Sequence, residues 1–527
     1  MSLAVGSLIA ALSALLSAVA YPPLEWRPLA FVALAPLLVA VRRLRLRDAM
    51  LCLFVWGEIF SFLVANALPD AVESYFQQPR WLSWVFAIGV WAGTGAIYFL
   101  GFGALQRALA GLRSGLQPLA VSAAWVSVEL VRARLLTDLD LFVSNPWALV
   151  GYSQVGFDPL MQLSSVTGVY GVSFAVVAVN AALAELWLRR GAPGPRWPVV
   201  AAGALPVAGA IAFGALVLRG ADDRASPGIP VAIVQTNIDL GARYRPELYG
   251  QNLDRYLRLT LQAIDEVRPP LVVWPEAALT FHLQEEPVYR KTIARVLAAG
   301  DAQLVAGGPW GVPGDPPFFS NSVFVLDAAG RVGGRYDKQI LVPFSEYTPS
   351  GGLALMRRNF GRFQEYARGP ESGPLPTVAG RAGIAVCNEI MLPEVVRRRV
   401  LDGAEILMNP SNDTWVSERN WSQLVFQMSL VRAIEYRRYL VRASTSGPSA
   451  IVDPWGRVQI RSQALSEALI AGTVRPRGDL TLYARLGDSF ALLCMAGVGV
   501  GVGVARQTAR GRRRLGPAQV PDQPERT

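Results

Sequence analysis

Long apolar segments separated by short polar or basic ones fill the first part of the chain, and one more lies near its end. A helix needs about 20 apolar residues to cross the hydrocarbon core of a bilayer. We therefore expect eight membrane-spanning helices, of which the second is short and contains Pro36. The predicted spans are Leu3–Ala20, Trp26–Val41, Ala49–Leu68, Trp81–Leu105, Leu116–Val131, Val166–Leu188, Pro198–Leu218 and Gly487–Ala505.

A different pattern begins at Pro230. Short apolar runs that end in polar residues, such as VAIVQTN, LVVWPEAAL and EILMNPSND, are typical of buried strands. Ala-Ala-Gly and Pro-Trp-Gly sequences mark hairpin turns between such runs. Helical spacing is found in Asn252–Val267, Leu392–Asp402 and Leu424–Arg437. The alternation predicts an α/β domain whose sheet is buried by helices.

These patterns divide the chain into four parts. We expect a membrane domain with seven helices over 1–222, an extracytoplasmic domain over 223–484, an eighth span over 485–506, and a basic, disordered tail over 507–527. Hydrophobic residues make up 52% of the chain and charged residues only 17%. That composition indicates a membrane protein with a substantial polar domain.

The basic residues mark an orientation. The net charge is +10, but the arginines cluster beside apolar segments, which favours a topology signal over nucleic-acid binding. Basic stretches follow the even-numbered spans, including RRLRLRD after the second, RRGAPGPR after the sixth and RQTARGRRR after the eighth. Because basic loops stay in the cytoplasm, we expect both termini inside and the α/β domain outside.

Two acidic residues interrupt the predicted spans. Glu58 lies in the middle of the third span, where an ionisable group costs about 2.5–3.5 kcal/mol, so we expect protein or water around it. Glu129 lies near the outer end of the fifth span, and we expect it to touch a functional site.

Three apolar strands of the α/β domain each end near one reactive group. Glu276 follows LVVWP, Lys338 follows GRVGGRYD, and Cys387 follows GIAV. Strand ends that border a crevice carry the chemistry of α/β sheets, although alone such a cysteine is more often a core residue and such a glutamate or lysine a surface residue. The three cysteines lie far apart, and His282 is the only histidine, which we place in an exposed loop. We predict no metal, organic cofactor or disulfide framework.

In this order and context, Glu276, Lys338 and Cys387 resemble the Glu-Lys-Cys triad of the nitrilase superfamily. The membrane half, with PPLEWRPLAFVALAPLL, SNPWALVGYSQ and SVTGVYGVSF, is similar to the apolipoprotein N-acyltransferase family, as are PFSEYTP and SNDTWV in the polar half. The resemblance implies an α-β-β-α sandwich next to a polytopic helical domain. It also implies a bacterial inner-membrane protein with its catalytic domain on the periplasmic side.

The resemblance assigns roles to the triad. Cys387 is the expected nucleophile, Glu276 the general base, and Lys338 the group that stabilises the tetrahedral oxyanion. Because a nearby cation lowers the pKa of a thiol, Lys338 should also favour the thiolate.

Five further residues are candidates for supporting roles. Glu346 is expected to orient the catalytic lysine or the incoming amine, and Glu389 either shares that role or is an acid at a helix N-terminus. The backbone N–H of Asn388 can add to oxyanion stabilisation if it opens a helix. Tyr347 and Trp415 lie in aromatic loops that we expect to act as lids over the site.

The implied reaction moves an acyl chain from a membrane phospholipid, through a cysteine thioester, to the N-terminal amine of a diacylglyceryl-cysteine on an apolipoprotein. We expect a monomer that uses the membrane but no nucleic acid. A membrane-anchored amidase and a non-catalytic transporter or receptor remain alternatives. The chain departs from the family at Asn388, where an aromatic residue is expected, and in STSGPSA, Ser444–Ala450. These departures bear on substrate preference.

Overall fold

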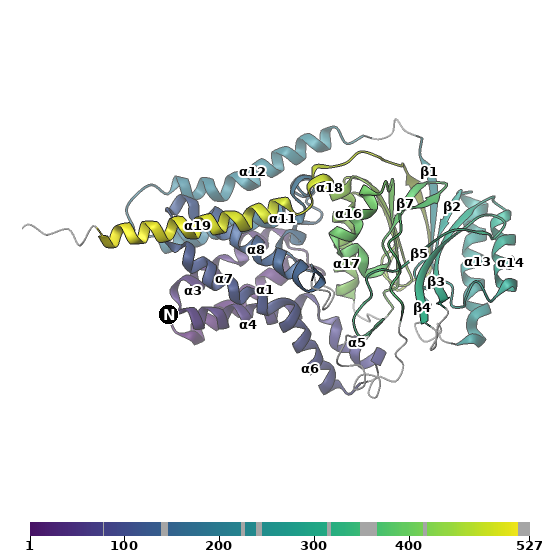
Figure 1. The fold of residues 1–527 in the computed structure, drawn as a ribbon, viewed down its shortest axis with the longest axis horizontal. Coiled ribbons are helices and arrows are strands. Elements are labelled where there is room, and N and C mark those ends of the chain that lie inside the picture. Colours follow the sequence, from purple (N-terminus) through teal and green to yellow (C-terminus); the bar gives the residue numbers. More distant parts are fainter. Residues whose placement is uncertain are drawn as a thin grey trace, which may run out of the picture.

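A helical bundle and a two-sheet sandwich lie side by side in this computed structural model (Figure 1). The structure describes residues 1–76, 78–138, 146–222, 227–238, 245–312, 318–347, 366–414 and 419–514. The predicted fold class, a helical membrane domain with an α-β-β-α sandwich, is confirmed.

The bundle is built from the first 219 residues and the last helices of the chain. Its α-helices are α1 Leu3–Val19, α2 Ala30–Ala33, α3 Ala35–Arg43, α4 Leu46–Val64, α5 Ala67–Phe76, α6 Arg80–Trp91, α7 Ile97–Ala108, α8 Gln117–Asp138, α9 Asp158–Met161, α10 Ser164–Thr167, α11 Val169–Leu188, α12 Trp197–Arg219, α18 Leu482–Leu486 and α19 Ser489–Arg514. Shorter turns are η1 Arg27–Leu29, η2 Ala92–Ala96, η3 Leu109–Gly111, η4 Ser114–Leu116 and η5 Val150–Gln154.

Fewer helices than predicted are long and apolar enough to cross a membrane. In the described part of the chain there are four, or five if α4 and α5, which are bent by 61°, form one broken span. The four are Arg80–Gly111, Val169–Leu188, Trp197–Arg219 and Ser489–Thr508.

Besides the third predicted span, which is bent between α4 and α5, three of the eight predicted spans look different in the structure. Helix α1 is apolar but has only 17 residues. The second predicted span is broken into η1, α2 and α3, with Pro36 in the first turn of α3. The fifth lies in α8, which is long enough but carries Glu129, Arg132 and Arg134.

The sandwich contains two six-stranded sheets. The first has the strand order β12-β1-β2-β3-β4-β5 and the second β11-β10-β9-β8-β7-β6. Their strands are β1 Ile229–Gln235, β2 Leu271–Val273, β3 Gln303–Val312, β4 Phe318–Leu326, β5 Val332–Asp337, β6 Leu375–Thr377, β7 Gly380–Ile384, β8 Ile406–Ser411, β9 Tyr439–Ser444, β10 Ala450–Val452, β11 Val458–Arg461 and β12 Ala468–Val474.

Strand pairing agrees with the predicted turns. The Ala-Ala-Gly turn joins the antiparallel strands β4 and β5, and the Pro-Trp-Gly turn joins β10 and β11. The first and last strands of the sandwich, β1 and β12, are also antiparallel neighbours, with Ile229 opposite Val474.

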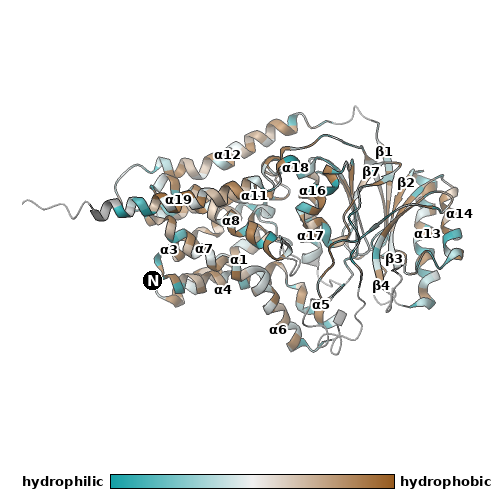
Figure 2. Cartoon of the chain, in the orientation of Figure 1, coloured by the Kyte–Doolittle hydropathy of each residue, from teal (hydrophilic) through white to brown (hydrophobic). Residues whose placement is uncertain are grey.

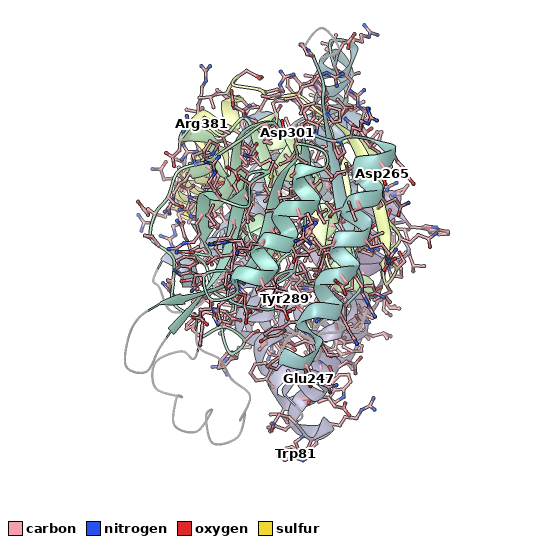
Figure 3. All side chains as sticks on the ribbon, turned by 90° about the vertical axis from the view of Figure 1, so that its right-hand side faces the viewer. Trp81, Glu247, Asp265, Tyr289, Asp301 and Arg381 are labelled. Atoms are coloured by element: carbon pink, nitrogen blue, oxygen red, sulfur yellow. The ribbon has the colours of Figure 1, made fainter. Side chains whose placement is uncertain are left out.

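Apolar layers hold the sandwich together. Buried side chains such as Val231 and Val273 of the first sheet meet Ile384 and Met408 of the second. Another layer lies between the first sheet and its outer helices, α13 Tyr249–Glu266 and α14 Pro287–Ala298. Figure 3 shows these two helices side by side over the sheet, with Tyr289 on α14.

Helices α16 Pro393–Leu401 and α17 Arg419–Tyr436 cover the second sheet on the side that faces the bundle (Figure 1). All three helices predicted for this domain are thus present with small shifts at their ends. One continuous cluster of buried apolar residues runs from Trp125 of α8 to Leu430 and Val431 of α17. Apolar residues accordingly extend through the bundle and into the layer between α17 and the second sheet, where Leu407 and Leu440 belong to the same cluster (Figure 2).

Buried polar contacts also fix α17 to the bundle. Arg432 Nη1 lies 2.9 Å from Glu435 Oε2, and both side chains have no exposed surface. Arg432 donates to the Tyr152 hydroxyl at 2.6 Å, and the backbone N–H of Val169, at the start of α11, donates to Glu435 at 3.1 Å. The helix that supports the second sheet is therefore also part of the bundle's core.

The two acidic residues of the predicted spans, Glu129 and Glu58, differ in how they contact the rest of the bundle. Glu129 is buried and accepts hydrogen bonds from Val150 N at 2.7 Å and Trp125 Nε1 at 3.2 Å, so it holds the segment after α8 in place. No hydrogen bond joins it to the reactive groups of the sandwich within the described residues, contrary to our expectation of a site contact. Glu58 is half-buried, and its Oε1 has no partner in the described chain.

Candidate active site

The three reactive groups of the sequence come together between the two sheets. Glu276 follows β2 and Lys338 follows β5, both in the first sheet, whereas Cys387 follows β7 in the second. Lys338 Nζ lies 3.6 Å from Glu276 Oε1, and the charges of both act on the Cys387 thiol. All three side chains are buried.

Lys338 is held by two carboxylates. Its Nζ donates to Glu346 Oε1 at 2.9 Å, a shorter contact than the one with Glu276. Burial acts to lower the pKa of Lys338, but Glu346 and Glu276 outweigh it and raise that pKa above its ordinary value. The side chain is therefore an ammonium, and its hydrogen bond to Glu346 fixes its position.

Asn321 is a member of the site that sequence reasoning missed. Its Nδ2 donates to Glu276 Oε1 at 2.6 Å and to Glu346 Oε1 at 2.9 Å. One amide thus fixes both carboxylates around the lysine. The sequence feature that could have revealed Asn321 is the polar run Ser320–Ser322 in the otherwise apolar strand β4. In the structure all three of these residues are buried.

The surroundings of Cys387 favour the thiol over the thiolate, although Lys338 acts in the expected direction. Burial raises the pKa of this thiol to about 12, and Glu276 adds to the rise, which outweighs the lowering by Lys338. Its backbone lies in the left-handed region at φ 51°, a strained conformation for a residue with a side chain. Such strain is common where a fold must aim one side chain.

Glu389 connects the lysine and cysteine loops. It accepts hydrogen bonds from Val386 N at 2.8 Å, Gln339 N at 2.8 Å, Ile340 N at 3.0 Å and the Tyr336 hydroxyl at 2.9 Å. Burial raises its pKa, although these bonds oppose the rise. With its oxygens bonded to three backbone N–H groups and the Tyr336 hydroxyl, Glu389 joins the two loops and forms no ion pair with Lys338 within the described residues.

The other predicted supporting residues have varied surroundings. Asn388 follows the nucleophile in the short 3₁₀ turn η8 Cys387–Met391, and its Nδ2 lies 3.4 Å from the Ile340 carbonyl. Tyr347 accepts a backbone hydrogen bond from Phe344 at 2.7 Å, and the Arg368 guanidinium lies over its ring. Trp415 lies outside the described residues.

A buried network of polar side chains in the second sheet supports the segment that carries Cys387. Asn409, in β8, donates to the carbonyls of Ala385 at 2.6 Å and Cys387 at 3.2 Å. Arg442 of β9 donates to the Asn409 oxygen, and to Asp413 at 2.8 Å. Sequence reasoning noted the NPSND motif but assigned no role to Asn409 or Arg442.

The segment Ser444–Ala450, where the chain departs from the family pattern, belongs to the same network. Asp413 accepts from the hydroxyls of Ser444 at 2.9 Å and Ser422 at 3.0 Å. A Cβ on Gly447 would lie only 1.8 Å from Asp413 Oδ2, so this close approach requires glycine. The segment thus stabilises the second sheet behind Cys387.

His282 is half-buried, with its ring 5.0 Å from that of Phe319, and not in an exposed loop as predicted. The apolar ring contact, on the strand that carries Asn321, explains why this polar stretch folds inward.

Comparisons with known proteins cover both parts of the chain. The family model for carbon-nitrogen hydrolases matches residues 230–479, and that for the apolipoprotein N-acyltransferase N-terminal domain matches residues 13–182. Among solved structures, an amidase from Nesterenkonia sp. is 18% identical and covers 49% of this chain and 94% of its own, with a TM-score of 0.37. The C. elegans NitFhit protein is 20% identical over 51% of this chain and 65% of its own, with a TM-score of 0.38.

Two curated relatives extend along nearly the whole sequence. The apolipoprotein N-acyltransferase of Geobacter metallireducens is 33% identical over 502 residues, which cover 94% of each chain. That of Azotobacter vinelandii is 30% identical over 505 residues, covering 91% of each chain. This identity, shared by the bundle and by the domain that holds Cys387, shows that the chain belongs to the apolipoprotein N-acyltransferase family.

Proposed function

We propose that this protein transfers an acyl chain from a membrane phospholipid to the α-amino group of a diacylglyceryl-cysteine at the N-terminus of an apolipoprotein. The observation that carries the proposal is the gathering of Glu276, Lys338 and the Cys387 thiol, in a domain whose core continues into an apolar helical bundle. One chain supplies all three groups, so a monomer suffices.

In the first half-reaction, the Cys387 sulfur attacks the ester carbonyl carbon of the phospholipid. Because the pKa of about 12 leaves little thiolate, Glu276 takes the thiol proton in the same step. The Lys338 ammonium stabilises the oxyanion that forms. The carbon–oxygen bond then breaks, Glu276 returns the proton to the departing oxygen, and a lysophospholipid leaves the acyl thioester behind.

In the second half-reaction, the free amine of the acceptor attacks the thioester carbonyl. Glu276 accepts a proton from this amine, and Lys338 again faces the oxyanion. The carbon–sulfur bond breaks, an amide is formed, and the departing sulfur regains its proton from Glu276. The site is then restored.

The position of the sandwich suits two lipid-anchored substrates. Helix α17 is buried against the bundle, and Phe86 of α6 contacts Phe344, two residues before Glu346, with ring centroids 5.4 Å apart. We propose that lipid reaches the site laterally past α6. Confinement to a membrane raises the encounter rate of both substrates and restricts their orientation.

Single-turnover labelling of the purified protein tests this proposal. A cysteine that first holds and then releases the acyl group predicts ping-pong kinetics. Phospholipid alone should release about one lysophospholipid per chain, as a thioester requires, and then stop, with the acyl mass on Cys387. A diacylglyceryl peptide with a free amine should discharge it, and an N-acetylated peptide should not.

The control is Cys387→Ala, which should insert normally and carry no acyl mass. Continuous release of fatty acid without acceptor would instead identify a hydrolase of the amidase type. Absence of any adduct on wild-type protein would favour a non-catalytic binding protein.

A further inference from the structure

Four arginines converge on a hollow in the bundle, at the end away from the sandwich. Its volume is about 370 Å³, within the usual range of small-ligand sites. The hollow, called the arginine pocket below, is lined by Arg42, Arg43, Leu44, Arg45, Arg107 and Ala110. These residues come from the end of α3, the turn before α4 and the end of α7, which lie far from the sheets (Figure 1).

Two of the guanidinium groups are held in place by neutral partners. Arg42 donates to Gln117 Oε1 at 3.0 Å, and Arg107 donates to the Leu44 carbonyl. Arg43 and Arg45 are exposed. Within the described chain, no carboxylate forms an ion pair with any of the four. Glu185 attracts Arg42 electrostatically, but within the described residues no carboxylate pairs with Arg43, Arg45 or Arg107, so the pocket keeps a net positive charge.

The neighbouring surface places this end of the bundle at the headgroup level of a membrane. Trp187, in the last turn of α11, and Trp197, the first residue of α12, are exposed, and the Arg190 guanidinium lies over the Trp187 ring at 4.5 Å. Exposed tryptophans beside arginines mark the membrane–water interface. A lipid whose tails lie along the bundle can thus place its headgroup at the pocket.

We propose that the arginine pocket binds the phosphate of an anionic phospholipid that is not a substrate. Guanidinium groups form paired, charge-assisted hydrogen bonds with phosphate oxygens, and basic pockets between membrane helices suit anionic headgroups. A topology signal requires only positive charge in a loop, whereas here the charges converge from three elements. The reactive groups lie in the sandwich at the other end of the molecule, so this lipid cannot reach Cys387.

Native mass spectrometry of the full chain in detergent tests the pocket with three probes: phosphatidylglycerol, phosphatidylcholine and inorganic phosphate. One phosphatidylglycerol per chain should bind at least about tenfold more tightly than phosphatidylcholine, whose choline opposes the arginines. Inorganic phosphate should not displace it at equal concentration, because it lacks the acyl chains.

The variant Arg43→Gln/Arg45→Gln should weaken phosphatidylglycerol binding by roughly ten- to thirtyfold. It keeps the hydrogen-bonded Arg42 and Arg107, and acyl loading of Cys387 reports that it is folded. The matched control Arg506→Gln/Arg510→Gln removes the same charge from α19 and should bind like wild type. Equal weakening in both variants, equal binding of the two lipids, or displacement by phosphate alone would overturn the proposal.

Discussion

At the scale of single residues, the raised pKa of the Cys387 thiol means that the proposed mechanism requires a base. The variant Glu276→Gln should form almost no thioester at pH 7, since an amide cannot accept the proton. Removing that carboxylate also removes a charge that raises the thiol pKa, so the pKa should fall. Loading should then recover as pH rises from 7 to 10. Intact mass of the acyl-enzyme at each pH measures this.

Wild-type loading should not show the same alkaline recovery, because its thiol stays protonated through that range. A Glu276→Gln rate equal to wild type at pH 7 would show that another group is the base.

We propose that Asn409 positions Cys387, because it donates hydrogen bonds to the carbonyls of Ala385 and of Cys387 itself. The variant Asn409→Asp keeps the acceptor for Arg442 but loses the donor, leaving buried carbonyls unsatisfied. At about 1–3 kcal/mol for such a group, kcat should fall roughly ten- to hundredfold, with little change in KM. Steady-state transfer assays with both substrates measure this split.

The control is Asn412→Asp, in the same segment, which keeps the oxygen that accepts from Thr414. An equal fall in kcat in the two variants, or a change in KM without a fall in kcat, would contradict the positioning role of Asn409.

Sequence reasoning finds residues that are exceptional in their local pattern. Glu276, Lys338 and Cys387 each follow an apolar strand, which made them visible. Asn321 donates hydrogen bonds to Glu276 and Glu346, which lie 45 and 25 positions away in the sequence. A local sequence pattern cannot predict such distant partners. The thiol pKa was also mispredicted, because burial, the largest contribution, is a property of the folded site.

Among the elements, α17 has two structural roles, because it covers a sheet and packs into the bundle. Its Arg432–Glu435 pair is fully buried. The variant Glu435→Ala leaves a buried arginine unpaired and should cost about 3–5 kcal/mol. Thermal unfolding in detergent should show a clear fall in apparent Tm.

The exposed pair Arg258–Glu467 supplies the control, because Glu467→Ala should cost only about 0–1 kcal/mol. Replacing both partners, as Arg432→Met/Glu435→Leu, should recover part of the loss. A Glu435→Ala protein as stable as the control would mean that the pair does not stabilise the contact.

Strands of the sandwich were predictable as short apolar runs that end in polar residues, and helix α13 was predictable from its helical spacing. The membrane-spanning helices were harder to predict from the sequence. Hydropathy alone marked Leu116–Val131 as a span, yet Glu129 and Arg132 of that helix face protein partners inside the bundle. Pro36 made the second predicted span doubtful as a continuous helix. In the structure this segment is interrupted just before Pro36, which lies in the first turn of α3.

At the scale of the molecule, the N-terminus and the far end of α19 lie at the end of the bundle away from the sandwich (Figure 1). This arrangement agrees with the basic loops, and we propose that the sandwich is periplasmic. A reporter fused after Leu218 should read extracytoplasmic, and one fused after Arg514 cytoplasmic. Alkaline phosphatase and green fluorescent protein fusions measure the two sides. Both reporters on one side would contradict the orientation.

The two folding units were visible in the sequence, but their docking was not. Tyr152 and Arg432 belong to segments far apart in the chain, and their hydrogen bond depends on the folded position of both domains.

The pairing of β1 with β12 determines when the first sheet can be completed during synthesis of the chain. Strand β2 follows β1 closely and can pair with it early, whereas the other edge of β1 stays open until the last strand is made. An open strand edge invites wrong pairing and aggregation. Helices α18 and α19 come directly after β12 in the sequence. The pairing of β12 with β1 and the packing of the last helix therefore become possible at nearly the same point of synthesis. A nascent chain interrupted before Ala468 would therefore meet quality-control proteases with that edge unprotected.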